Sequence, residues 1–122
     1  VYPFEITEGG DGCWVMDADS WVRQMVADIK RGVPQGRISA RFHLTLSCMM
    51  VDAVVRVGRE TGLGRVVLSG GVFNNDTVFF QVTRMLEAKG FKVYTHSIVP
   101  CGDGGIALGQ AMAAAALQHR SF

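Results

Sequence analysis

The stretch 65-RVVLSGGVFNN-75 predicts the fold of this chain of 122 residues. Its residues 66–68 are typical of a short buried strand, Gly70 and Gly71 of a tight turn, and the residues that follow of the start of a helix. A strand that ends in glycines before a helix exposes backbone N–H groups, and the helix dipole points the same way. The stretch therefore suits phosphate or another anion, although an ordinary tight turn explains the glycines equally well.

Helical patterns flank this strand on both sides. Apolar residues recur at helical spacing from about Gln35 to Glu60 and from about Asn75 to Lys89, with Gly90 ending the second helix. Residues 91–95 predict another short strand, and strands separated by a helix imply parallel pairing and an α/β fold. The inward faces are expected to comprise Ile38, Phe42, Leu46, Met49, Ala53 and Val57 in the first helix, and Val78, Val82, Met85 and Leu86 in the second.

The two ends of the chain complete the predicted lobe. Residues 2–7 and 13–17 flank a turn at 8–12 and predict a β-hairpin, which we expect to extend the same sheet in antiparallel fashion. A helix should follow, capped by Asp17 or Asp19 and ending at Lys30. The last helix, from Asp103 to about Gln118, is apolar on nearly every side, which is typical of a helix sandwiched in a core. Residues 1–122 thus predict one α/β lobe with a mixed sheet.

Composition bounds the classes of function. Apolar residues make up 48% and charged residues 19%, as in globular proteins, and the net charge of +1 shows no basic surplus of the kind that binds nucleic acid. The longest apolar run, residues 104–117, is shorter than the roughly 20 residues that cross a bilayer. The three cysteines form no CxxC pair, which favours a reduced, cytoplasmic setting over a zinc site or a disulfide framework. Because the chain begins with Val-Tyr-Pro-Phe, we expect a segment of a longer protein that carries half of a site.

Two glycine-rich turns are the candidate binding elements. Residues 70–75 (GGVFNN) and 101–105 (CGDGG) each follow a strand and lead into a helix. The carboxyl ends of neighbouring parallel strands open on one edge, where α/β sheets bind ligands, so we expect the two turns to meet there. Asp103 is either a helix cap or a ligand to a divalent cation, and Asn75 is either an N-cap or a hydrogen-bonding group for a ligand.

The remaining chemically active side chains favour structural roles. His43 lies in the middle of a predicted helix, which favours a satisfied core or interface histidine over a catalytic one. His96 and His119 are expected at the surface, and no HxxxH or HExxH pair builds a histidine metal site. Cys101 precedes a helix start, where a thiol can become reactive, but a plain half-buried thiol is the favoured interpretation.

Three segments in this order, ISARFHLTL (38–46), LSGGVFNN (68–75) and GDGGIALGQA (102–111), resemble the C-terminal end of the HypF-type hydrogenase-maturation carbamoyltransferases. The resemblance covers nearly the whole chain. It implies the second lobe of a domain similar to the tRNA threonylcarbamoyltransferases, with the ribonuclease H-like fold shared by actin, sugar kinases and heat-shock ATPases. One departure is mild, since Asn74 stands where we expect glutamine.

The resemblance implies an activity that uses carbamoyl phosphate and ATP to make a carbamoyl-adenylate. The carbamoyl group then passes to the C-terminal cysteine of a HypE-type partner, a step towards the cyanide ligands of nickel–iron hydrogenase. Two alternatives stay open. One is a relative that acts as an O-carbamoyltransferase or a tRNA threonylcarbamoyltransferase, and the other is a non-catalytic docking module whose glycine turns are merely structural.

The resemblance also implies roles for individual residues. Gly70, Gly71 and Val72 would approach the nucleotide phosphates, and Asn75 would hold the adenosine moiety. Asp103 would contribute to a divalent-metal site whose histidine pair lies in the preceding lobe, so this chain would hold a partial site. No catalytic residue is assigned within the chain, because the nucleophilic thiol belongs to the partner. The lobe alone is expected to be inactive and, with its apolar surface uncovered, prone to self-association.

Overall fold

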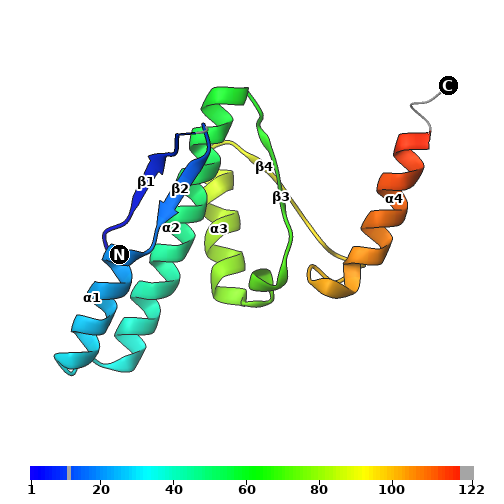
Figure 1. Cartoon of the computed structure of the whole chain (residues 1–122). Helices are drawn as coiled ribbons and strands as arrows, with labels where there is room; N and C mark the ends of the chain where they lie inside the picture. Colours follow the sequence, from blue (N-terminus) through cyan, green and yellow to red (C-terminus); the bar gives the residue numbers. More distant parts are fainter. Residues whose placement is uncertain (11, 119–122) are drawn as a thin grey trace.

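The long helix α2 (Gln35–Thr61) runs through the centre of the molecule (Figure 1). The computed structural model describes residues 1–10 and 12–118. Helices α1 (Asp19–Lys30) and α3 (Asp76–Ala88) both pack against α2. The other elements are β1 (Glu5–Glu8), β2 (Trp14–Asp17), β3 (Arg65–Leu68), the short 3₁₀ helix η1 (Gly71–Asn74), β4 (Lys92–Thr95), the short 3₁₀ helix η2 (Asp103–Gly105) and α4 (Ile106–Gln118).

The helix boundaries follow local signals in the sequence. Helix α2 ends at Gly62, which adopts the left-handed conformation with φ of 71° and donates its N–H to the Gly58 carbonyl. Gly90, beyond α3, has φ of 87°. At the start of α1, the candidate caps behave differently from the prediction: Ala18 occupies the N-cap position, and the Asp17 carboxylate accepts the N–H of Asp19 at 2.9 Å. The predicted helices are confirmed to within a residue or two at these ends.

Strands β3 and β4 form the predicted parallel pair. Val66 lies opposite Val93, and Leu68 lies opposite Thr95. Leu68 is buried against the helices, whereas Val67 points to the other face and is 68% exposed. The prediction of a fully buried strand is therefore wrong for Val67, because in the part of the chain that the structure describes this sheet is covered on one face only.

The core lies between α2, α3 and β3. Its buried cluster consists of Val51, Leu68, Val78, Val82 and Leu86. The inward face predicted for α3 is confirmed, with Met85 half-buried beside this cluster. Burial of these side chains in water-free contact is the main favourable term in the stability of the lobe.

Helix α2 is buried on more than one side, so its predicted stripe is only partly right. Met49 is buried, but Val57 is 44% exposed, and two polar residues off the stripe are fully buried. Thr45 accepts the N–H of Tyr2 at 2.8 Å on the side of the N-terminal segment. Ser47 Oγ lies 2.9 Å from Gln81 Oε1 of α3 and 2.9 Å from the carbonyl oxygen of His43, so its single hydrogen is shared between two acceptors. A helix with partners on two sides buries small polar residues that a single apolar stripe does not predict.

The β1–β2 hairpin is antiparallel, as predicted, with Ile6 opposite Met16. It does not extend the parallel pair, because β1–β2 and β3–β4 are separate two-stranded sheets among the described residues. The hairpin lies along α2, where Arg56 donates to the carbonyl of Ile6 at 3.3 Å. The α/β class with a hairpin and helix-flanked parallel strands is confirmed, but the expectation of one mixed sheet is wrong.

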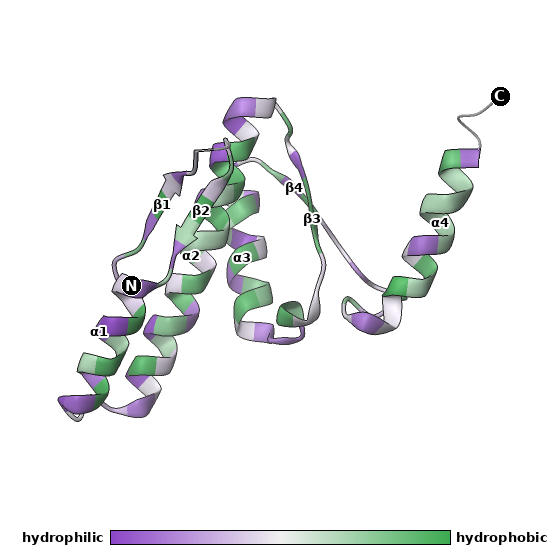
Figure 2. Ribbon diagram, in the orientation of Figure 1, coloured by the Kyte–Doolittle hydropathy of each residue, from purple (hydrophilic) through white to green (hydrophobic). Residues whose placement is uncertain are grey.

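Helix α4 stands apart from the rest of the molecule (Figure 1) and makes its principal contacts with η2. Apolar residues occupy most of its circumference (Figure 2). Ile106, Leu108 and Met112 are each more than half exposed. The prediction of a sandwiched core helix is therefore wrong within this chain, because no described element covers it.

Helix α2 also has the length and composition of a membrane span, with a mean hydropathy of 1.3 over its most apolar window. Its contacts are those of a helix inside a protein, because it packs against α1 and α3. It carries an ion pair between Arg56 and Asp52 at 3.3 Å.

Candidate functional site

The two glycine-rich turns meet at the carboxyl ends of β3 and β4. Gly70 donates its N–H to the carbonyl of Cys101 at 2.7 Å. A Cβ placed on Gly102 would lie 3.7 Å from the Cα of Gly71, so the two backbones are in direct contact. The predicted convergence of the turns at one rim is confirmed.

Some backbone N–H groups of the first turn are hydrogen-bonded within the protein, and others are available to a ligand. Gly70 has φ of 111° and ψ of 156°, a conformation that side chains other than hydrogen disfavour. Its N–H is already bonded to Cys101, whereas no acceptor among the described residues takes the N–H of Gly71 or Val72. Gly71 and Val72 therefore offer the donors that an anion needs at the start of η1, and Gly70 provides the backbone conformation that presents them.

Side chains hold the two turns together. The Cys101 thiol donates to Asn74 Oδ1 at 3.2 Å. Ser69 Oγ lies 3.5 Å from the Cys101 carbonyl and 3.1 Å from His96 Nε2. The half-buried, hydrogen-bonded state of Cys101 fits the interpretation of a structural thiol. His96 is exposed, as predicted, while His119 lies outside the described residues.

Asn75 fulfils its predicted capping role and has a second partner. Its Oδ1 accepts the N–H of Val78 at 3.2 Å, which makes Asn75 the N-cap of α3. Its Nδ2 lies 3.0 Å from Nε2 of His43. Because an amide nitrogen carries two hydrogens and Asn75 is exposed at the rim, one N–H remains for a ligand.

His43 reaches the site from α2. Its Nδ1 lies 2.7 Å from the carbonyl of Ser39, and its ring packs edge-on against Phe42 at 5.3 Å between centroids. The interpretation of a satisfied histidine fits these contacts. The contact between His43 and Asn75 is not predicted by any local signal in the sequence, because it depends on how α2 packs against α3.

Asp103 lies in η2 with an exposed side chain. Gly102 occupies the N-cap position of η2 and Asp103 lies in its first turn, so the capping interpretation of Asp103 is not realised. Within the described ranges, no group of three His, Cys, Asp or Glu residues has the arrangement that holds a metal ion. Asp103 fits one ligand of a divalent cation, and the residues that the structure describes do not supply a complete ligand set.

The shape of the second turn requires a glycine at position 105, two residues after Asp103. A Cβ on Gly105 would lie 2.6 Å from the carbonyl oxygen of Pro100, closer than real contacts allow. Beside this turn is a hollow of about 330 Å³, a size at the lower end of ligand pockets. It is lined by Leu68, Phe73, Asp76, Phe79 and residues 95–101.

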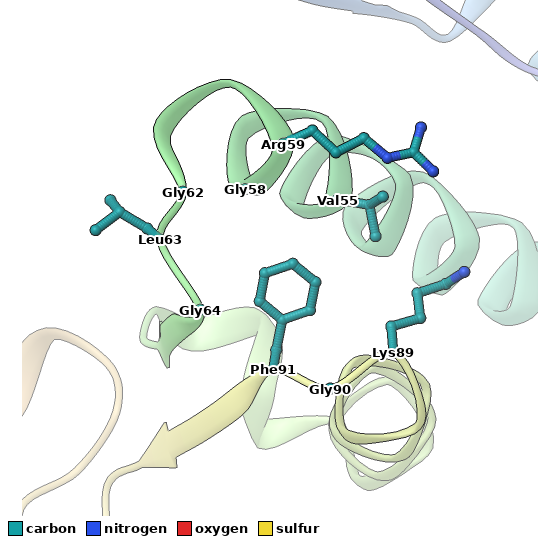
Figure 3. Close-up of a pocket in the computed structure, with 9 residues that line it drawn as sticks. All are labelled: Val55, Gly58, Arg59, Gly62, Leu63, Gly64, Lys89, Gly90 and Phe91. Atoms are coloured by element: carbon teal, nitrogen blue, oxygen red, sulfur yellow. The ribbon is translucent and has the colours of Figure 1, made fainter.

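Another hollow, of about 420 Å³, lies at the opposite end of β3 and β4 (Figure 3). The ring of Phe91 points from the start of β4 towards α2, and Arg59 and Lys89 lie on the lining. Ligands of open parallel sheets bind outside the carboxyl ends of the strands, so we do not assign this hollow to the site.

Comparison with known proteins gives consistent matches. Residues 1–110 match the family model described as carbamoyltransferase, Kae1-like domain, second subdomain. A carbamoyltransferase HypF homolog of Cupriavidus necator is 34% identical over 103 residues, which cover 83% of this chain and 26% of the relative. A tRNA N6-adenosine threonylcarbamoyltransferase of Sorangium cellulosum is 32% identical over 80 residues, covering 62% of this chain and 22% of the relative.

Solved structures agree with these matches. Full-length HypF in its phosphate- and nucleotide-bound form superposes with a TM-score of 0.89 at 40% identity, covering 93% of this chain and 15% of that protein. HypF of T. kodakarensis superposes with a TM-score of 0.78 at 26% identity, covering 95% of this chain and 15% of that protein. The chain therefore spans about a quarter or less of the relatives that it matches.

Proposed function

The chain belongs to the HypF-type carbamoyltransferase family, as the second subdomain of the Kae1-like domain, and from this premise we propose that it carries one side of a nucleotide-dependent carbamoyl-transfer site. The observation that carries the proposal is the contact between the two turns at the carboxyl rim, where Gly70 bonds to Cys101. A structural relative of this chain at 40% identity is described as full-length HypF bound to phosphate and nucleotide, which supports nucleotide binding by the full-length protein.

The proposed reaction transfers a carbamoyl group from a carbamoyl-adenylate, made from carbamoyl phosphate and ATP. The acceptor is the C-terminal cysteine thiol of a HypE-type maturation partner, and the product serves the cyanide ligands of nickel–iron hydrogenase. The thiol sulfur attacks the carbamoyl carbon and forms a C–S bond. The bond from that carbon to the AMP phosphate oxygen breaks, AMP leaves, and the thiol proton passes to solvent.

In this proposal the described residues bind and orient the nucleotide. The free N–H groups of Gly71 and Val72 bind a phosphate oxygen at the start of η1, where the unpaired donors favour negative charge. Asn75 donates its remaining Nδ2–H to the adenosine moiety, and Gly70 holds the turn in shape. Asp103 contributes one carboxylate to a divalent-metal site that the preceding lobe completes. A divalent ion bound there would neutralise phosphate charge.

The proposal places the chain, residues 1–122, as the second lobe of a longer cytoplasmic enzyme that contacts its own upstream lobe. The absence of a disulfide at Cys48 and Cys101 supports a reducing setting. The net charge of +1 supports an acceptor other than nucleic acid.

A second candidate is a tRNA threonylcarbamoyltransferase, or an O-carbamoyltransferase of similar architecture. The 32% identity with the Sorangium enzyme favours it, because this value is close to the 34% identity with the HypF homolog. The two candidates differ in the acceptor, a protein thiol or a nucleoside. A third candidate, a non-catalytic docking module, predicts no nucleotide binding at all.

The test uses the full-length protein with carbamoyl phosphate, ATP and a partner protein that ends in cysteine. Mass spectrometry measures carbamoylation of the partner thiol. We expect Asp103→Ala and Asn75→Ala each to lower the rate by about tenfold or more, which corresponds to the loss of about 1.4 kcal/mol of binding or orientation. The control Asp19→Ala removes an exposed carboxylate of α1 and should leave the rate unchanged.

Three outcomes decide between the candidates. Full activity in both Asp103→Ala and Asn75→Ala would contradict the assignment of these two residues to the site. Transfer to tRNA in place of the thiol supports the threonylcarbamoyltransferase. No binding of ATP to the full-length protein leaves the docking module as the surviving candidate.

A further inference from the structure

A hydrogen bond between α2 and α3 holds the amide of Asn75 at the rim of the proposed site. Nε2 of His43 lies 3.0 Å from Nδ2 of Asn75. The two residues are 32 positions apart in the chain, and the bond joins the helices that make the most extensive helix–helix contact of the described fold.

The partners of the His43 ring determine where its proton lies. Nδ1 is 2.7 Å from the backbone carbonyl of Ser39, and a carbonyl can only accept a hydrogen bond. Nδ1 therefore carries the proton, and in the neutral ring Nε2 has the free lone pair. That lone pair requires a donor, and Asn75 Nδ2 is the atom within reach.

The cap of α3 determines the orientation of the Asn75 amide independently. The N–H of Val78 needs an acceptor, so Oδ1 of Asn75 faces the helix at 3.2 Å. The opposite end of the amide, Nδ2, then faces His43. The two assignments agree, because the cap leaves a donor where the histidine ring offers an acceptor.

An asparagine held only by its cap has an amide plane that is loosely defined, because the terminal torsion of asparagine has broad minima. A second partner at Nδ2 fixes that plane. One Nδ2 hydrogen points to His43, and the direction of the other hydrogen is then fixed as well. A pre-oriented donor loses less conformational entropy when a ligand binds.

We propose that His43 is a positioning residue, which aims the second N–H of Asn75 at a hydrogen-bond acceptor of the bound nucleoside. The inference rests on the proposed function, because it needs Asn75 to contact the nucleotide. His43 itself does not touch the ligand. Its own position is set by the edge contact with Phe42 and by Ser47, whose hydroxyl bonds to the carbonyl of His43 at 2.9 Å.

The experiment measures ATP binding to the full-length protein by isothermal titration calorimetry. We expect His43→Leu to raise the Kd for ATP by about three- to tenfold, since the loss of one orienting hydrogen bond is worth about a factor of this size. His43→Gln places an amide oxygen near the former Nε2 and should recover most of the affinity. The control Arg37→Ala removes an exposed side chain of α2 that does not contact the ring, and it should match the wild type.

A double-mutant cycle separates positioning from a general structural effect. In the Asn75→Ala background, His43→Leu should change the Kd no further, because the amide that it orients is gone. In turnover assays, His43→Leu should raise the KM for ATP while kcat stays within about twofold. Nitrogen NMR of the wild-type imidazole, which needs no variant, should show the proton on Nδ1 at neutral pH.

Each contrary result has a distinct meaning. A wild-type Kd in His43→Leu together with a weakened Asn75→Ala overturns the positioning role and leaves the proposed site intact. An unchanged Kd for ATP in Asn75→Ala overturns both the positioning role of His43 and the proposed contact between Asn75 and the nucleotide. Effects that simply add in the double variant, or an imidazole protonated on Nε2 in the wild type, also overturn the inference.

Discussion

Asp28, on the inner side of α1, is a carboxylate that is only 2% exposed. It accepts the hydroxyl of Tyr2 at 3.0 Å, Arg31 at 2.7 Å, and Arg41 from α2. Burial by itself raises the pKa of Asp28, but the hydrogen bond from Tyr2 and the charges of Arg41 and Arg31 outweigh it and hold the pKa below its usual value. A single residue thus ties the N-terminal segment to both helices.

The lowered pKa of Asp28 predicts how stability depends on pH. The unfolded value is about 3.9, so the stabilising contribution is fully present above that pH and is lost as the pH falls through the lower, folded value. We expect Asp28→Asn to lower the melting temperature at neutral pH and to flatten its decline below about pH 4. Thermal unfolding followed by circular dichroism across this pH range measures both effects.

The control for this prediction is Asp19→Asn, which removes an exposed carboxylate paired with Arg23 at 3.4 Å. Exposed ion pairs contribute little to stability, so the melting temperature of Asp19→Asn should follow that of the wild type at every pH. Parallel pH profiles for Asp28→Asn and the wild type would contradict the assigned role of Asp28.

At the rim, residue types alone left several roles open. Glycine after a strand predicts a turn, but it does not say which N–H groups remain unpaired. The N–H of Gly70 is taken by the carbonyl of Cys101, which lies in a different loop. Asn75 is both a cap and a partner of His43, because α2 and α3 meet at that point. Asn74 accepts a hydrogen bond from the thiol of Cys101 and so joins the two turns.

At the scale of elements, the end of α2 is packed closely against the start of β4. A Cβ on Gly58 would lie 2.8 Å from the ring of Phe91 and 3.2 Å from the carbonyl of Leu63 (Figure 3). Gly36, near the start of the same helix, has nothing within 4 Å of its would-be Cβ. Close packing therefore requires glycine at position 58, whereas position 36 has space for a side chain.

Alanine at these two positions should have opposite effects. Gly36→Ala is expected to raise the free energy of unfolding by about 0.5 kcal/mol, because alanine loses less backbone entropy in a helix. Gly58→Ala has the same entropic benefit but forces the ring of Phe91 to move. We therefore expect this variant to lower the free energy of unfolding by about 1–2 kcal/mol. Urea unfolding of the two variants gives the comparison, and equal changes in stability would contradict the packing argument.

For the whole molecule, the main feature is the apolar surface left uncovered by the described residues. Helix α4 exposes Leu108 and Met112 by 51% and 64%, and the outer face of the parallel pair exposes Val67 by 68%. Large exposed apolar side chains grouped on one element, as on α4, are typical of an interface. We expect the upstream lobe to cover this surface in the full-length protein, and a second copy of the chain to cover it when the lobe is alone.

We therefore expect the 122-residue chain on its own to self-associate as its concentration rises. The double variant Leu108→Lys/Met112→Lys should shift the population towards the monomer mass of 13.2 kDa. Gln110→Lys adds a charge to the same helix without removing apolar surface, and it should associate like the wild type. Sedimentation velocity over a range of concentrations measures these populations. A monomeric wild type throughout that range would contradict the prediction.

Features that depend on neighbours along the chain are predictable from the order of the amino acids. Helical spacing, strand-forming runs and glycines at helix ends specify each element within a few residues, and parallel pairing of β3 with β4 brings the turns at 70–75 and 101–105 to one rim. Three features of the described residues depend on tertiary packing: the hairpin forms its own sheet, α4 is left uncovered, and His43 contacts Asn75. The physical reason is that these features arise from packing and hydrogen bonds between residues far apart in sequence, which no local pattern encodes.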